Sequence, residues 1–222
     1  MTDTTEVATT QGGAVPALVQ TPATELTGED IALPALKLGQ FMSDHVQEDR
    51  VPSGSIFSAT GADDPDPVVL WEQGNEEKLR FYVLGLKKGK SVSSDGELVL
   101  FDYNDPDAPA EAWVTYNYAI ALPNVDEEMP YKLLLTRTGK PAAQQINTII
   151  AKNPNVPSFK LAFELDCKER QNKKGKFFVP RVSHVEATEA EVEIAEKLSN
   201  LVNADPAAGQ AAPADRAEEP AI

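Results

Sequence analysis

Positively charged side chains alternate with aromatic ones in two separate stretches of this 222-residue chain. Residues 79–92 carry Arg80 and three lysines with no acid, a local charge of +4. Residues 131–181 carry eleven Lys or Arg against three acids, a local charge of +8. Because the whole chain has a formal net charge of −15, this segregation indicates a basic face on an otherwise acidic molecule.

Cations beside aromatic rings supply the two interactions that an unpaired polynucleotide strand can make. Lysine and arginine neutralise phosphates and release counterions. Aromatic faces stack on exposed bases, each contact contributing about 1–3 kcal/mol whatever the base. A duplex hides its bases, so this combination favours single strands. The candidates for phosphate contacts are Lys87, Lys88, Lys90, Lys132, Arg137, Lys168, Arg170, Lys173, Lys174 and Lys176, and the candidates for stacking are Tyr82, Trp113, Tyr116 and Phe178.

The same residues have a plainer interpretation, in which the lysines form a solvated surface and the rings fill the core. We expect core positions for Phe81, Phe159, Phe163 and one member of the pair Phe177 and Phe178. For the remaining rings the choice stays open, because a one-residue change of strand register moves every side chain to the other face.

Residue sets for catalysis and metal binding are sparse. The chain has one cysteine, Cys167, and two histidines, and it lacks phosphate-loop and zinc-protease motifs. We therefore expect no enzyme, no disulfide scaffold, no cofactor and no metal site. A metal-dependent nuclease would need a carboxylate cluster, and Asp63, Asp64 and Asp66 lie close together in a proline-rich segment. A solvated turn is the favoured interpretation of that segment.

Short strands separated by turns dominate the middle of the chain. A lysine-rich turn at 171–175 predicts a hairpin, and Lys87–Lys90 predicts a second basic turn. The strands expected from the apolar patterns are 55–58, 79–86, 98–101, 113–122, 131–136, 159–167 and 177–179.

Two helices are expected, one at 141–152 and one at 188–203. Pro141 suits a first helical turn, and Thr188 with Glu191 has the spacing of a capping box. A helix between strands is common in the five-stranded barrel of the oligonucleotide-binding type. The prediction is therefore a mainly β protein with two helices, an OB-fold-like β-barrel.

The two ends of the chain differ in composition from the middle. Residues 1–30 hold five acids and no base, and residues 204–222 are rich in Ala, Pro and acids. Neither end can bury enough apolar surface to fold, so we expect disordered N- and C-terminal tails. Between them we expect an OB-like nucleic-acid-binding domain at 31–187 and then the C-terminal helix at 188–203, which offers a surface for a homo-oligomer.

Composition excludes several classes of protein. A pI near 4.5 is incompatible with a histone-like coat protein. No apolar run approaches the roughly 20 residues that a membrane span needs. The first residues lack the basic and apolar regions of a secretory signal. We expect a cytoplasmic protein with no membrane partner.

The stretch Leu33–Gln40 (LPALKLGQ), followed by Ser43 and Pro52–Ile56 (PSGSI), resembles the opening of bacteriophage single-stranded-DNA-binding proteins. An apolar strand, a helix, and then Phe163–Leu165 and Lys173–Pro180 (KKGKFFVP) fit the same pattern. The resemblance rests on strand lengths, turn glycines and aromatic positions.

This resemblance covers about residues 31–185. It implies an oligonucleotide/oligosaccharide-binding barrel that coats single-stranded DNA during phage replication or recombination, in the cytoplasm of the host cell. Bacterial single-strand binders also end in an acidic tail with a hydrophobic tip, and here the tail closes with Glu218–Ile222 (EEPAI). By that likeness, replication or recombination proteins are the expected partners of the acidic C-terminal tail.

Two other functions fit the same composition. A virion structural or assembly protein would be present in particles and would have no affinity for single strands. An acidic DNA mimic would bind a host protein through residues 94–128, which hold nine acids and no base. Our leading hypothesis is a sequence-nonspecific single-stranded-DNA-binding protein without catalytic activity.

Overall fold

The computed structural model describes residues 33–60, 64–94, 97–173 and 175–204, so both predicted tails lie outside the described residues, apart from Ala204, which ends the last helix. The strands are β1 (Ala35–Leu38), β2 (Ile56–Ala59), β3 (Val68–Trp71), β4 (Leu79–Ser94), β5 (Glu97–Asp102), β6 (Trp113–Leu122), β7 (Asp126–Thr136), β8 (Ala162–Asn172) and β9 (Gly175–Val185). The helices are α1 (Asp44–Gln47), α2 (Lys140–Lys152) and α3 (Glu189–Ala204), with short 3₁₀ turns η2 (Arg137–Gly139) and η3 (Ser158–Lys160).

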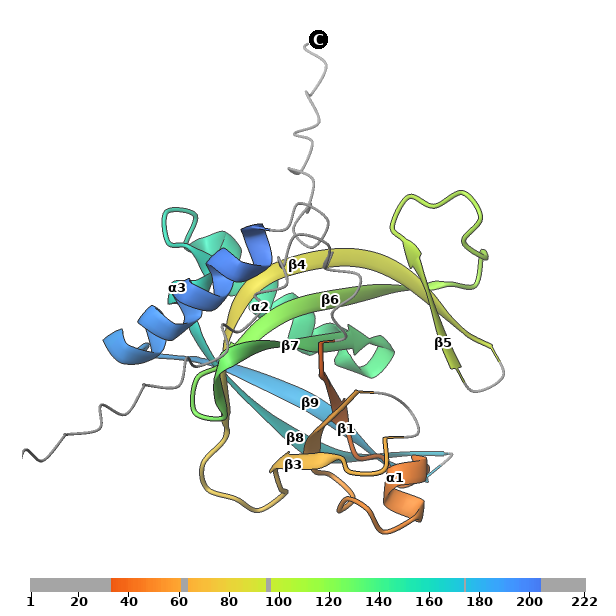
Figure 1. Ribbon diagram of the computed structural model, residues 1–222. Coiled ribbons are helices and arrows are strands. Elements are labelled where there is room, and N and C mark those ends of the chain that lie inside the picture. The colour runs from red at the N-terminus through yellow and green to blue at the C-terminus, as the bar shows by residue number, and fades with distance from the viewer. Residues whose placement is uncertain (1–32, 61–63, 95–96, 174, 205–222) are drawn as a thin grey trace, which may run out of the picture.

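All nine described strands belong to one sheet that curls into an open half-barrel (Figure 1). Their order is β3-β2-β1-β7-β6-β4-β8-β9, and β5 pairs with β4 outside this path. The long strand β4 organises the sheet, because it pairs with β8 at its start, β6 along its length and β5 at its end. A register irregularity between Val83 and Gly85 interrupts its pairing with β6, and such bulges bend strands. The expectation of a mainly β, barrel-like fold is confirmed.

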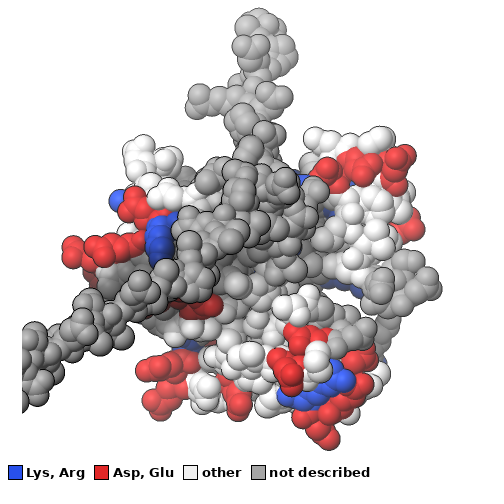
Figure 2. Space-filling view, viewed as in Figure 1, with Lys and Arg blue, Asp and Glu red and all other residues white. Residues whose placement is uncertain are grey.

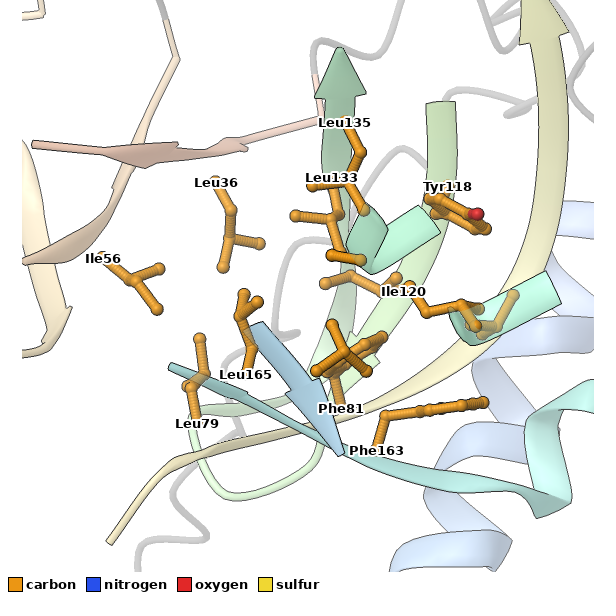
Figure 3. Packing of buried hydrophobic residues seen from close by; sticks show 14 of the residues in the cluster. Leu36, Ile56, Leu79, Phe81, Tyr118, Ile120, Leu133, Leu135, Phe163 and Leu165 are labelled. Carbon is orange, nitrogen blue, oxygen red and sulfur yellow. The ribbon is translucent and has the colours of Figure 1, made fainter. Parts of the chain in front are cut away.

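The concave side of the sheet holds the main hydrophobic core. Phe81, Ile120, Leu133 and Phe163 come from four different strands and converge there (Figure 3). Helix α2 covers this core, and its Ile146 is fully buried. Burial of apolar area on this scale is the main contribution that holds the curled sheet together.

A second apolar cluster lies on the convex side, where α3 packs. Tyr82 and Leu84 of β4 meet Ala195 and Leu198 of α3 there. β4 is therefore apolar on both faces between residues 81 and 84, as its sequence predicted. None of the helices in the described ranges has the length and apolar character to cross a membrane.

Several elements match the sequence-based prediction and others do not. Strand β6, helix α2 and the hairpin of β8 and β9 are confirmed. The predicted basic turn at Lys87–Lys90 is wrong, because these residues continue β4. All four pair with β6, and Gly89 and Lys90 also pair with β5 on the other edge. Gly89 allows β4 and β5 to approach closely, since a Cβ at this position would lie 2.7 Å from the Phe101 carbonyl oxygen. Strands β1 and β3 were not predicted at all.

Candidate nucleic-acid interface

Strands β4, β5 and β6 extend beyond the core as a three-stranded arm. We use this name for residues 86–94, 97–102 and 113–117, which form the upper right-hand part of Figure 1. In the space-filling view a hollow separates the arm from the lower body, and Lys or Arg atoms show at its rim (Figure 2).

One face of the arm combines lysines with aromatic rings. Strand register places Lys88 opposite Tyr116, and Lys90 opposite Phe101. Directly opposed residues share a face of a sheet. Tyr116 has the same strand parity as Tyr118, which points into the concave core, so this face continues the concave side.

Tyr103 completes this face. The Nζ atom of Lys88 lies 3.7 Å from the centroid of the Tyr103 ring, and that of Lys90 lies 6.0 Å away. Cation–π attraction of this kind contributes about 0.5–1 kcal/mol at an exposed site. We name the set Lys88, Lys90, Phe101, Tyr103 and Tyr116 the cation–aromatic face.

The cation–aromatic face is accessible to a ligand. Tyr103 is 39% exposed and Lys88 is exposed, whereas Lys90, Phe101 and Tyr116 are half-buried. Within the part of the chain that the structure describes, neither lysine forms an ion pair with an acid. Both charges are thus available to phosphates, next to a ring that is open to solvent.

A second cation–aromatic pair lies where β7 ends. The guanidinium carbon of Arg137 sits 3.4 Å from the centroid of the Trp113 ring. The pairing of Thr136 with Thr115 brings the two together. Arg137 has a φ of +37°, a left-handed conformation that is uncommon for a residue other than glycine. The indole Nε1 of Trp113 is buried and has no hydrogen-bond partner among the described residues.

Arg137 also lines a hollow of about 410 Å³ between the end of β7 and the β8–β9 hairpin. Lys176 from β9 is the second cation in its wall, and its Nζ lies 2.7 Å from Glu169. The other lining residues are Gln40, Thr136, Thr138, Asn172, Gly175, Phe177 and Phe178. The fold therefore unites two of the predicted phosphate-contacting residues that are far apart in sequence.

Two of the four predicted stacking residues are enclosed by the core. Tyr82 is 0% exposed and its hydroxyl donates to Glu191 at 2.9 Å, and Phe178 is 1% exposed and belongs to the concave core. Neither ring has a face open to a base, which corrects their assignment. Tyr116 and Trp113 are only half-buried.

The predicted phosphate-contacting residues do not gather in a single trough. Lys87 lies on the opposite face of the arm from Lys88 and pairs with Asp102 at 2.8 Å. Lys132 is paired with Ala119, which faces the convex cluster.

The remaining predicted cations belong to the β8–β9 hairpin. Lys168 lines a different hollow, of about 580 Å³, together with Trp71 and Arg181. Arg170 and Lys173 are exposed near the hairpin tip, and Lys174 lies outside the described residues.

Phe101 and Tyr103 were missed as candidate ligand-contacting residues. Tyr103 directly precedes Asn104-Asp105-Pro106, which indicated only the end of a strand. A strand that continues through residues 87–94 pairs its last six residues with residues 97–102, and this pairing places Phe101 on the same face as Lys90. The sequence thus held the information that places Phe101 and Tyr103 beside the lysines, but the wrongly predicted turn at Lys87–Lys90 concealed it.

Of the acidic segment considered for a nuclease, the structure describes Asp64 and Asp66. The carboxylate of Asp64 accepts hydrogen bonds from the Thr60 N–H at 2.8 Å and hydroxyl at 2.9 Å, and from the Asp66 N–H at 3.1 Å. These bonds, led by the one from the Thr60 backbone, lower the pKa of Asp64. Asp63 lies outside the described residues. Where the structure describes the chain, three or more His, Cys, Asp or Glu side chains do not cluster as a metal site would require.

The geometry of the cation–aromatic face is the feature of the molecule from which a function can be inferred. Comparisons of the chain with models of protein families, with curated proteins and with solved structures find no match.

Proposed function

We propose that this protein binds single-stranded DNA without sequence preference, through a surface centred on the cation–aromatic face. The observation that carries the proposal is the placement of Lys88 3.7 Å from the Tyr103 ring, with Lys90 and Tyr116 on the same concave face. Phosphates would contact the lysines while unpaired bases stack on the rings.

The chemistry of the face supports a single strand over a duplex. Stacking on Tyr103 requires a base whose plane is free, which a duplex offers only at its ends. Among the described residues, the cations placed over the Tyr103 ring are the lysines Lys88 and Lys90, which suit phosphates more than the edges of particular bases, so we expect binding that is independent of sequence.

Arg137 and Lys176 offer two further cations at the hollow between the end of β7 and the β8–β9 hairpin. Trp113 has the opposite strand parity to Tyr116, so this pair of cations forms a contact separate from the cation–aromatic face. Arg137 covers one face of the Trp113 ring, and planar guanidinium groups stack on bases as well as pair with phosphates. The curled half-barrel is compatible with an OB-like fold, and the resemblance of residues 33–56 to phage proteins supports a role in phage DNA replication or recombination.

The test is a titration of fluorescently labelled oligo-dT with the full chain, followed by anisotropy. We expect saturable binding at low salt and a steep loss of affinity as salt rises. A labelled duplex of equal length is the matched comparison and should bind more weakly.

Absence of oligo-dT binding at low salt would refute the proposal, as would equal or tighter binding to the duplex. In that case a structural role in a virion, or DNA mimicry by the acidic segments, becomes the better hypothesis.

A further inference from the structure

The outer end of the arm is apolar at its edge and acidic in its loop. Leu98 is 41% and Leu100 is 53% exposed on β5, a strand that pairs with β4 alone among the described strands. The loop after β5 contains Asp105, Asp107 and Glu111 and no base. Acidic atoms gather over this end of the arm (Figure 2). Exposed strand edges of this kind are usually protected by lysine, proline or a partner.

The β8–β9 hairpin has the complementary character. Lys168, Arg170 and Lys173 are exposed on it, and no ion pair joins any of them to an acid in the described ranges. Register places Arg170 opposite Phe177 and Lys168 opposite Val179, so one face of the hairpin carries two cations and two half-buried apolar side chains.

We propose that two copies of this chain associate about a two-fold axis, with the arm of each copy docked on the β8–β9 hairpin of the other. The acidic loop faces the hairpin cations, and Leu98 and Leu100 face Phe177 and Val179. Charge complementarity of this kind selects the partner and its orientation.

The arrangement of the two elements in one molecule supports two-fold symmetry. The arm and the tip of the β8–β9 hairpin both project toward the same side of the body (Figure 1). A two-fold rotation therefore forms the arm–hairpin contact twice and closes the assembly, whereas a head-to-tail contact would need them on opposite sides. Forming the contact twice doubles the surface area that the dimer buries. This matters because a stable interface buries roughly 1,200–2,000 Å² in total.

The proposed dimer leaves the cation–aromatic face open. Leu98 and Leu100 alternate along β5 with Val99 and Phe101, so they lie on the opposite face of the arm from Lys90. Phe177 also lines the hollow of Arg137 and Lys176, so the dimer contact borders that hollow but not the cation–aromatic face. The two proposals are carried by different observations, and each can fail without the other.

Light scattering of the full chain after gel filtration, at micromolar protein and low salt, tests the dimer. Two charge-reversed variants are needed, Asp105→Lys with Asp107→Lys, and Arg170→Glu with Lys173→Glu. Each variant alone should self-associate at least about tenfold more weakly, because like charges then face one another. An equal mixture of the two should recover the dimer, since both contacts then join opposite charges.

The variants change exposed side chains, and circular dichroism checks that each one remains folded. A monomeric wild-type chain, or variants that stay dimeric alone, would overturn the inference. Lys88→Ala is the control for the other proposal and should leave the dimer intact. If the hairpin variant loses oligo-dT affinity but stays dimeric, the hairpin belongs to the DNA surface and the dimer proposed here is wrong.

Discussion

The side-chain amide of Gln40 pairs with the backbone of Phe178 in the way that a neighbouring strand would. Its Nε2 donates to the Phe178 carbonyl at 2.9 Å, and its Oε1 accepts from the Phe178 N–H at 2.9 Å. The two residues are 138 positions apart in the chain. One glutamine thereby ties the loop after β1 to the edge of β9, next to the hollow that Arg137 and Lys176 line.

Gln40→Ala should destabilise the fold by about 1–3 kcal/mol, because both backbone groups of the buried Phe178 lose their partner. Urea unfolding followed by tryptophan fluorescence measures this change. Gln40→Glu is the matched variant, since a carboxylate still accepts from the N–H but cannot donate to the carbonyl, and it should retain part of the stability. Equal stability of wild type and Gln40→Ala would show that the tie contributes nothing.

Gly54 packs against the ring of Phe178. Its φ is +80°, and a Cβ on it would lie 2.8 Å from the Phe178 ring. Gly54→Ala should therefore cost about 1 kcal/mol for the left-handed backbone plus a further cost for the steric overlap. Urea unfolding measures the total loss in the free energy of unfolding.

Gly74→Ala separates the two contributions. Gly74 has a φ of +104°, and a Cβ on it would have no atom within 4 Å. This variant should show the backbone cost alone and so be less destabilised than Gly54→Ala. The steric argument fails if the two variants unfold at the same urea concentration.

The fold was predictable from sequence where apolar periodicity was unambiguous. Strand β6 alternates over ten residues, and its Tyr118, Ile120 and Leu122 are fully buried as that alternation required. Strands β1 and β3 have only four residues each, too few for alternation to stand out.

The candidate site was less predictable because it depends on pairing across the sheet. The cation–aromatic face forms only in the register that pairs β4 with β5. This pairing was not predicted, because glycine at position 89 suggested a turn. The burial of Tyr82 follows from α3, whose position on the convex face no local pattern reveals. Sequence therefore indicated the residue types of the proposed binding face, but not which of these residues share a surface.

Glu191 should make the attachment of α3 dependent on pH. Burial opposes its ionisation, but hydrogen bonds from Thr188, Tyr82 and Arg80 outweigh burial and hold its pKa below the usual value of 4.5. A carboxyl whose pKa is lowered by folding stabilises the folded state above its unfolded pKa. That contribution disappears as the pH falls through the folded pKa.

Glu191→Gln should thus lose about 1–3 kcal/mol at pH 7, and the difference from wild type should shrink between pH 5 and roughly pH 3. Urea unfolding at both ends of this range provides the comparison. Glu189→Gln is the control, because Glu189 is an exposed acid in the same helical turn. A difference that stays constant with pH would exclude Glu191 as the titrating group.

Lys88 and Lys87 form an internal test of the proposed binding face, because they are adjacent in β4 and point to opposite sides. Lys88 lies over Tyr103 on the concave face, and Lys87 pairs with Asp102 on the other. If the strand follows the cation–aromatic face, Lys88→Ala should weaken oligo-dT binding and reduce the slope of log affinity against log salt by about 0.7, the value for one phosphate on a single strand.

Lys87→Ala removes the same charge from the same strand and should leave both affinity and slope close to wild type. Tyr103→Ala should weaken binding by about 1–3 kcal/mol without changing the slope, since stacking displaces no counterions. Anisotropy titrations at several salt concentrations give all of these quantities. Equal losses for Lys87→Ala and Lys88→Ala would indicate a general electrostatic attraction instead of a defined face, because only a bound strand on one side distinguishes two neighbouring lysines.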